Sequence, residues 1–231
     1  MVSSEHNRLA ELDSYNILHS AQEKLFDDLA ELAAYIFSVP VARIAFVHRQ
    51  GVWHKASVGM PAQETIDLEQ SLCPRAIKAD EPVLVYTDLA ALPQASTDTA
   101  RERQVRFYAG APLRTSAGHC IGTVCLAGYE PRQFTEAEQQ LLQQLSGLVV
   151  QALEARRYLL TAHTPAEWEL LRQDAEEALH NQMAVVRYLK ARSEGQVPVP
   201  SALLEPISRR LVEVAEVFSL GRPPEAPEGS V

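Results

Sequence analysis

The chain has 231 residues, of which 46% are hydrophobic and 22% charged, and these proportions exclude a collagen-like, disordered or disulfide-scaffold protein. Its formal net charge of -9 predicts repulsion from phosphate backbones, so we expect no nucleic-acid partner. No apolar run reaches the roughly 20 residues that span a bilayer, the N-terminal sequence lacks a signal-peptide pattern, and only three cysteines occur. We therefore expect a cytoplasmic protein without membrane contact.

Three sequence patterns of the capping-box type predict where helices begin. They run over Ser20–Glu23, Thr135–Glu138 and Thr164–Glu167, each with a hydroxyl three residues before a glutamate. Apolar residues then recur at spacings of three and four, which is typical of amphipathic helices. Two C-terminal helices are expected over 165–192 and 203–219. The apolar seam of the second consists of Leu204, Ile207, Leu211, Val214 and Phe218.

Between the first two boxes the pattern changes to short runs of β-favouring residues. Residues 41–47 and 52–58 predict one hairpin, and residues 105–113 and 121–127 predict another. A single strand is expected over 83–86. Strands that are joined mainly by hairpins and flanked by helices predict an α+β fold, with an antiparallel sheet and helices on one face.

The composition divides the chain into three parts. Residues 1–158 are needed to complete the sheet domain, and residues 159–221 form a two-helix hairpin. The Pro- and Glu-rich residues 222–231 are expected to be disordered. Because an isolated hairpin exposes one apolar face, we expect a homodimer joined through these C-terminal helices as a four-helix bundle.

Several motifs occur in an order that is typical of one family. In chain order they are Trp53-His-Lys55, Ser71-Leu-Cys73, Arg106-Phe-Tyr-Ala-Gly-Ala-Pro-Leu113 and Gly122-Thr-Val-Cys125. With these motifs the chain resembles a bacterial GAF domain, a small-molecule sensor module related in architecture to PAS domains. The resemblance implies an antiparallel sheet with helices on one face and a ligand pocket on the other. His48 and Gly128 stand where many relatives carry Asp, so a degenerate pocket that serves only dimerisation is an alternative.

A pocket of this kind would be lined from the sheet face that the helices leave open. Ligand pockets are mostly apolar with a few polar groups, and the strands supply side chains of both kinds. The candidate ligand-binding residues are Phe46, Trp53, Leu72, Cys73, Ile77, Phe107, Tyr108 and Cys125. The sequence identifies neither the ligand nor a cofactor.

The cysteines Cys73, Cys120 and Cys125 allow two interpretations. Most cysteines are small buried hydrophobes. Cys73, followed by Pro74 and Arg75 at an expected helix start, is the best candidate for a nucleophile, which needs a lowered pKa and access to solvent. That role implies a cysteine-dependent reductase resembling the free methionine sulfoxide reductases. Because the cysteine spacing does not match that family, we expect a protein without enzymatic activity.

The histidines predict no metal site. No histidine pair has the spacing of metal ligands on a helix, and His48 and His54 offer only a weak site across the first hairpin. The C-terminal hairpin is faintly similar to a histidine-kinase dimerisation module, with His180 in the place of a phosphoacceptor. That similarity implies a phosphotransfer or docking adaptor served by a partner kinase or response regulator. The first expectation is a sensory signalling protein whose ligand acts on the C-terminal helices.

Overall fold

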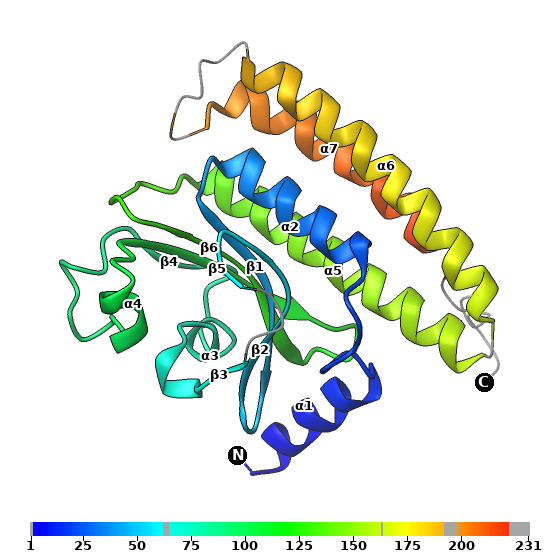
Figure 1. The fold of residues 1–231 in the computed structure, drawn as a ribbon, viewed down its shortest axis with the longest axis horizontal. Helices are drawn as coiled ribbons and strands as arrows, with labels where there is room; N and C mark the ends of the chain where they lie inside the picture. Colours follow the sequence, from blue (N-terminus) through cyan, green and yellow to red (C-terminus); the bar gives the residue numbers. More distant parts are fainter. Residues whose placement is uncertain (1, 62–64, 163, 192–196, 198, 222–231) are drawn as a thin grey trace, which may run out of the picture.

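A six-stranded sheet forms the centre of the protein, with helices on both sides (Figure 1). The computed structural model describes residues 2–61, 65–162, 164–191, 197 and 199–221. The strand order is β3-β2-β1-β6-β5-β4, and every neighbouring pair is antiparallel. The α+β fold with an antiparallel sheet is confirmed.

Five of the six strands lie close to their predicted positions, and the strand over Thr65–Ile66 was not predicted. The first hairpin consists of β1 (Val41–His48) and β2 (Gly51–Val58), and the second consists of β5 (Phe107–Arg114) and β6 (Cys120–Gly128). Short strands form the two edges, β3 (Thr65–Ile66) beside β2 and β4 (Leu84–Tyr86) beside β5. Both hairpins form because runs rich in Val, Ile and aromatic residues are interrupted by short polar turns that contain glycine.

Two long helices cover one face of the sheet, and shorter elements cover the other (Figure 1). The covering helices are α2 (Lys24–Phe37) and α5 (Glu136–Thr161). On the opposite face lie η1 (Leu68–Gln70), α3 (Cys73–Ala76) and α4 (Asp98–Glu102). The N-terminal helix α1 (Val2–Ser14) contacts β6.

A bulge in β2 decides which of its side chains face the helices. Ile44 pairs with Ala56, and Ala45 pairs with His54, so Lys55 is the extra residue. Lys55 consequently binds groups on the helix side of the sheet, whereas His54 lies on the other side.

The capping box at the start of α5 is confirmed. Thr135 Oγ1 accepts a hydrogen bond from the Glu138 amide (3.3 Å), and Glu138 accepts one from the Thr135 amide (2.9 Å). The third predicted helix, α6 (Pro165–Ala191), begins directly after Thr164 as expected.

The capping box predicted for Ser20–Glu23 is wrong. Helix α2 begins at Lys24, and Glu23 at its N-cap makes no capping hydrogen bond. The side chains of Ser20 and Glu23 accept hydrogen bonds from Lys55 instead. A buried ammonium group is more costly to leave without acceptors than a helix end, so the tertiary contact takes precedence over the local one.

The C-terminal hairpin packs on the helices of its own chain. Helices α6 and α7 (Ser201–Ser219) lie against α2 and α5, which separate them from the sheet (Figure 1). The whole predicted seam of α7 is buried there: Leu204, Ile207, Leu211, Val214 and Phe218. The four-helix arrangement therefore forms within one chain. The apolar face from which the homodimer was inferred is buried in that chain and no longer supports a homodimer.

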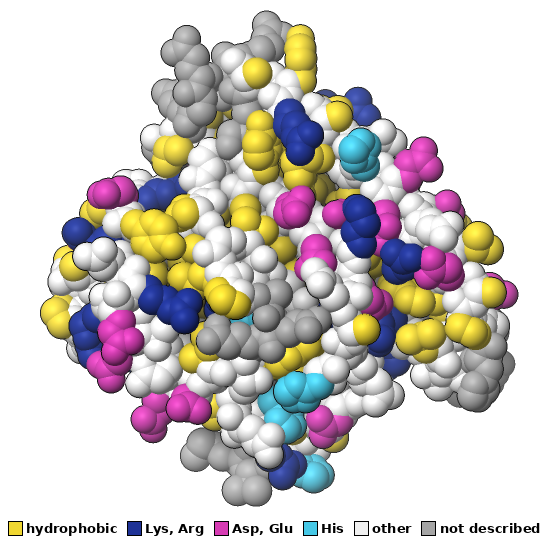
Figure 2. Space-filling model, viewed as in Figure 1, with side chains coloured by type: hydrophobic (Ala, Val, Ile, Leu, Met, Phe, Trp, Pro, Cys, Tyr) yellow, Lys and Arg dark blue, Asp and Glu magenta, His cyan; other side chains and the backbone are white. Residues whose placement is uncertain are grey.

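The remaining expectations on organisation concern boundaries and surface. Residues 222–231, the predicted tail, lie outside the described residues, and the predicted boundary after residue 158 falls inside α5. Among the described helices, none combines the length and apolarity that crossing a bilayer requires. Acidic and basic side chains are interspersed over the face in Figure 2, with hydrophobic groups between them.

Candidate functional site

A cavity of about 90 Å³ opens on the sheet face opposite α2 and α5. The segment from β3 to the residues just before β5 forms its walls, and the sheet forms its floor. The floor residues are Val41, Arg43, His54, Tyr108, Cys125 and Ala127. Strand alternation selects them, since successive side chains of a strand point to opposite faces. On β1, for example, Arg43 reaches the cavity while Ile44 packs beneath the helices.

Five of the predicted ligand-binding residues lie on the cavity side of the sheet. Leu72, Cys73, Tyr108 and Cys125 line the cavity, and Ile77 packs against the same hydrophobic cluster. The structure thus brings together residues from α3, β5 and β6. Their role in binding stays a prediction.

The other three predicted residues lie on the helix side, which corrects their expected place. Phe46, Trp53 and Phe107 belong to the core beneath the helices. The rings of Phe46 and Trp53 stack at 6.3 Å between centroids, and Phe107 packs on Phe134 at 5.5 Å. These side chains have the opposite alternation phase from Arg43 and Tyr108, so they cannot share the cavity with them.

Two buried cysteines meet where the wall of the cavity joins its floor. The Sγ atoms of Cys73, in α3, and Cys125, in β6, are 3.9 Å apart although 52 positions separate them in the sequence. The Tyr108 hydroxyl donates to Cys73 Sγ at 3.8 Å. All three cysteines are free and buried. Cys120 is the first residue of β6, and its carbonyl oxygen accepts a hydrogen bond from Arg8 (3.5 Å).

Gly110 makes room for the Tyr108 hydroxyl. A Cβ atom on Gly110 would lie 2.5 Å from Tyr108 Oη, so a larger residue would displace the phenol. On the neighbouring strand Tyr86 packs on the same ring, with 6.3 Å between the centroids. The absence of a side chain at Gly110 therefore lets the phenol reach Cys73.

Hydrogen bonding and burial oppose each other in setting the pKa of Cys73, whereas both raise the pKa of Cys125. The hydrogen bond with Cys125 has the largest effect on Cys73, and with those of Ser71 and Tyr108 it lowers the pKa of Cys73 to about 6 despite burial. The same hydrogen bond, together with burial, raises the pKa of Cys125 well above its usual value. Burial also raises the pKa of Tyr108, so the phenol stays protonated and able to donate. The pair therefore loses a first proton far more readily than a second.

Polar contacts fix the walls of the cavity. Gln70 Oε1 accepts from the Thr99 amide and hydroxyl, both at 3.1 Å, and so joins η1 to α4. Arg106 makes two hydrogen bonds of 2.7 Å to the Asp88 carboxylate, which close the segment between β4 and β5. The floor residue Arg43 contacts His54 Nε2 at 3.1 Å.

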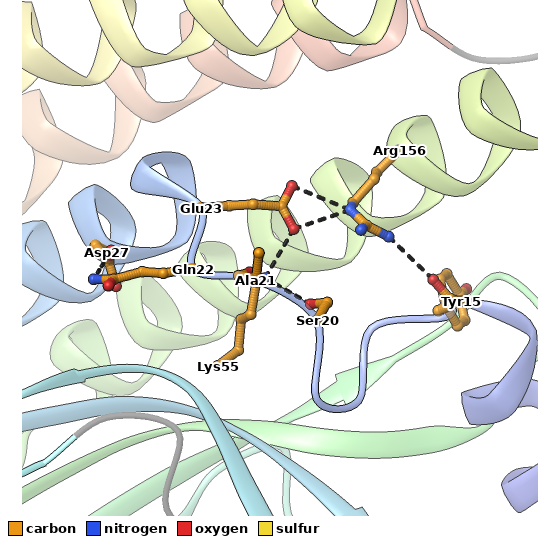
Figure 3. Close-up of polar contacts among 8 residues, drawn as sticks. All are labelled: Tyr15, Ser20, Ala21, Gln22, Glu23, Asp27, Lys55 and Arg156. Atoms are coloured by element: carbon orange, nitrogen blue, oxygen red, sulfur yellow. Dashed lines mark hydrogen bonds and ion pairs between the residues drawn. The ribbon is translucent and has the colours of Figure 1, made fainter. Parts of the chain in front are cut away.

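A polar network lies on the helix side of the same sheet (Figure 3). Lys55 Nζ donates to Ser20 Oγ (2.8 Å), the Ala21 carbonyl oxygen (2.5 Å) and Glu23 Oε1 (2.8 Å). Arg156 of α5 donates to both oxygens of Glu23 at 3.1 Å. Sequence reasoning missed this network, and its one signal was a lysine within the β-favouring run of residues 52–58.

The histidines do not form the weak metal site that was considered across the first hairpin. His48 lies opposite Gly51, and His54 lies opposite Ala45, so the two are not cross-strand neighbours. Within the described ranges there is no group of three or more His, Cys, Asp or Glu side chains that could hold a metal ion. His180 lies exposed on α6, and its phosphorylation stays a prediction.

Comparison with known proteins decides the family. A model of the GAF domain family matches residues 22–153, more than half of the chain. The chain belongs to the GAF domain family. Over 156 residues this GAF protein is 30% identical to a cyclic di-GMP phosphodiesterase of Pseudomonas aeruginosa, a match that covers 66% of the chain and 26% of that relative.

Two further matches extend over different shares of this GAF protein. Over 95 residues it is 30% identical to a diguanylate cyclase of Escherichia coli, covering 41% of the chain and 27% of the cyclase. The chain thus spans about a quarter of the length of the curated relatives it matches. The solved GAF domain of an Acinetobacter phosphoenolpyruvate-protein phosphotransferase is 18% identical, with a TM-score of 0.46, covering 70% of this chain and 95% of that one.

Proposed function

We propose that this GAF domain is a sensory module of signal transduction in which a small polar molecule binds the cavity and acts on the helices behind the sheet. The cavity carries the proposal, because it is built on the sheet face that the long helices leave open. The curated relatives, named as a phosphodiesterase and a diguanylate cyclase, support a place in signalling. We assign a regulatory rather than a catalytic role.

The volume of the cavity limits the ligand. About 90 Å³ admits a molecule of only a few heavy atoms, whereas sites for drug-sized ligands have volumes of ~300–1,000 Å³. The walls offer hydroxyl and amide groups from Gln70, Ser71, Thr97 and Thr99, and the floor offers the hydroxyl of Tyr108, beside apolar side chains. A small polar metabolite fits these dimensions, and a tetrapyrrole or a dinucleotide does not.

Strand β2 offers a route from the cavity to the helices. His54 lines the cavity, and the adjacent Lys55 binds Glu23 on the other face of the sheet. Glu23 in turn binds Arg156 of α5, and α5 packs against α7. A ligand that prefers one position of β2 would therefore shift the packing of the C-terminal helices through its differential affinity.

Thermal denaturation with a panel of small metabolites tests binding. A true ligand at about 100 times its Kd stabilises the protein by ~2.7 kcal/mol, which raises Tm by roughly 5–10 °C in a chain of this size. The variant Ala100→Leu fills the cavity from α4 and should lose this rise, while Ala202→Leu on the exposed side of α7 should keep it. Equal shifts in both variants would place binding elsewhere.

Tryptophan fluorescence tests the coupling. The chain has two tryptophans, Trp53 beside Phe46 and Trp168, buried in α6. In the Trp53→Phe variant, Trp168 alone reports on the C-terminal helices. Ligand binding should change its emission, and unchanged emission at saturation would refute the transmission to α6.

Three other expectations stay predictions. A homodimer would have to use side chains of the hairpin that remain exposed, such as Leu170 and Tyr188 of α6. Phosphotransfer from a partner kinase, or docking of a response regulator, would use the exposed His180, and labelling of wild type but not of His180→Ala would support it. The reductase interpretation requires turnover of an oxidised substrate by the cavity cysteines.

A further inference from the structure

Cys73 and Cys125 are the one pair of thiols in contact within the described part of the chain. Their Sγ atoms lie 3.9 Å apart, and a disulfide bond measures about 2.0 Å, so a relative shift of about 2 Å brings the sulfurs to bonding distance. Cys125 belongs to the central strand β6, which is paired on both sides. Cys73 belongs to the four-residue helix α3, which is connected on both sides by irregular segments. We therefore expect α3, and not β6, to move when the two sulfurs approach each other.

The cavity gives a small reagent access to these buried sulfurs. Cys73 and Cys125 have 3% and 7% of their surface exposed, and both line the cavity. Cys120 also has only 8% exposed but does not line it. A reagent of a few atoms can thus meet the pair from the cavity side, whereas a protein or peptide thiol cannot.

We propose that Cys73 and Cys125 form a modification site for small hydroperoxides, which convert the two thiols into an intramolecular disulfide. The proposal goes beyond the sensory function and does not depend on a bound metabolite.

The chemistry balances with the hydroperoxide as the only co-reactant. The Cys73 thiolate attacks one peroxide oxygen, the O–O bond breaks, and the alkoxide or hydroxide that leaves takes up the proton that Cys73 released. Cys73 is then a sulfenic acid. The Cys125 sulfur attacks the Cys73 sulfur, and the sulfenic hydroxyl leaves with the Cys125 proton as water. Two thiols lose two electrons in total, and the peroxide is reduced to an alcohol and water, or to two waters for hydrogen peroxide.

The surroundings assign the two roles. Cys73 accepts a hydrogen bond from Tyr108, and its sulfur is in hydrogen-bonding contact with that of Cys125. Both contacts favour the Cys73 thiolate and lower its pKa, the contact with Cys125 most. Cys125 keeps its proton, because the hydrogen bond with Cys73 and burial both raise its pKa. Cys73 is therefore the attacking thiol, and Cys125 is the thiol that resolves the sulfenic acid.

Oxidation of the full wild-type chain with hydrogen peroxide tests the site directly. The expected product is a monomer whose intact mass has lost two hydrogen atoms, with a peptide map that joins the Cys73 and Cys125 peptides and reverts after dithiothreitol. Cys73 should react roughly tenfold or more faster than Cys120, since its thiolate fraction is larger. A map that joins either residue to Cys120, a bond between two chains, or two thiols that stay alkylatable would each overturn the proposal.

Single variants test the order of the steps. Cys120→Ser should form the disulfide like wild type and serves as the matched control. Cys125→Ser should stop at a sulfenic acid on Cys73, which dimedone traps, whereas Cys73→Ser should give no rapid dimedone adduct. A dimedone adduct on Cys125 of the Cys73→Ser variant that forms as fast as wild type is oxidised would overturn the assigned order. The wild-type peptide map decides the site itself even if a variant does not fold, and no metabolite is needed, so this test and the ligand test can fail separately.

Discussion

Lys55 Nζ lies 2.8 Å from Glu23 Oε1, and this contact joins the bulge of β2 to the N-terminus of α2 (Figure 3). The Lys55 side chain is completely buried. Burial lowers its pKa, while the hydrogen bond to Glu23 acts in the opposite direction. Because Arg156 of α5 shares the Glu23 carboxylate, one acidic side chain ties the sheet to both helices that cover it.

Replacement of Lys55 by methionine should destabilise the fold. The change leaves Ser20, the Ala21 carbonyl oxygen and Glu23 without their buried donor, and we expect a loss of about 2 kcal/mol in the free energy of unfolding. Lys24→Met is the matched control, since Lys24 is exposed and its ion pair with Asp28 contributes less than about 1 kcal/mol. Urea unfolding measures both, and equal losses would contradict a structural role for the network.

Replacement of Glu138 by alanine should be among the most damaging single changes. Glu138 is fully buried, forms an ion pair with Arg132 and accepts from the Val199 amide (3.1 Å). Its removal leaves a buried arginine without its carboxylate, for which we expect a loss of about 3–5 kcal/mol. Glu136→Ala, on the exposed side of the same first turn, should change stability by less than about 0.5 kcal/mol.

The packing of α7 within the chain makes a prediction on stability and on assembly. Leu211 is fully buried between helices, so Leu211→Ala should cost about 2–5 kcal/mol in unfolding free energy. Leu170→Ala, with the same change at a residue that is 62% exposed, should have a small effect. Sedimentation should give the same assembly state for both variants and wild type. If Leu211→Ala lost a dimer that wild type and Leu170→Ala form, the apolar seam of α7 would instead be an interface between two chains.

The ion pair between Arg106 and Asp88 predicts a pH dependence. The hydrogen bonds from Arg106 hold the pKa of Asp88 at about 2, below the usual 3.8. Because the folded-state pKa is lowered, the stabilisation is complete above pH 3.8 and disappears as the pH falls toward about 2. The difference in urea midpoint between wild type and Asp88→Asn should shrink over this interval. A difference that stays constant would exclude ionisation of Asp88 as its source.

Local patterns determined most of the secondary structure. The hairpins, the α5 capping box and the start of α6 involve residues that are neighbours in sequence or across a short turn, so their hydrogen bonds form from local information. The resemblance to GAF domains added the expectation of a ligand pocket on the sheet face opposite the helices, whereas the strand order came only from the structure. The apolar seam of α7 also followed from the spacing of its residues, since a buried helix face requires that periodicity.

Only the tertiary structure decided on which side of the sheet each side chain of these elements lies. The phase of alternation placed Phe46 and Tyr108 on opposite sides of the sheet, because the face that receives helices depends on the whole packed layer and on the bulge at Lys55. The same packing moved Ser20 from a helix cap to a buried lysine and brought Cys73 beside Cys125. Contacts between residues far apart in sequence depend on how separate elements pack, and that information is not contained in any local pattern.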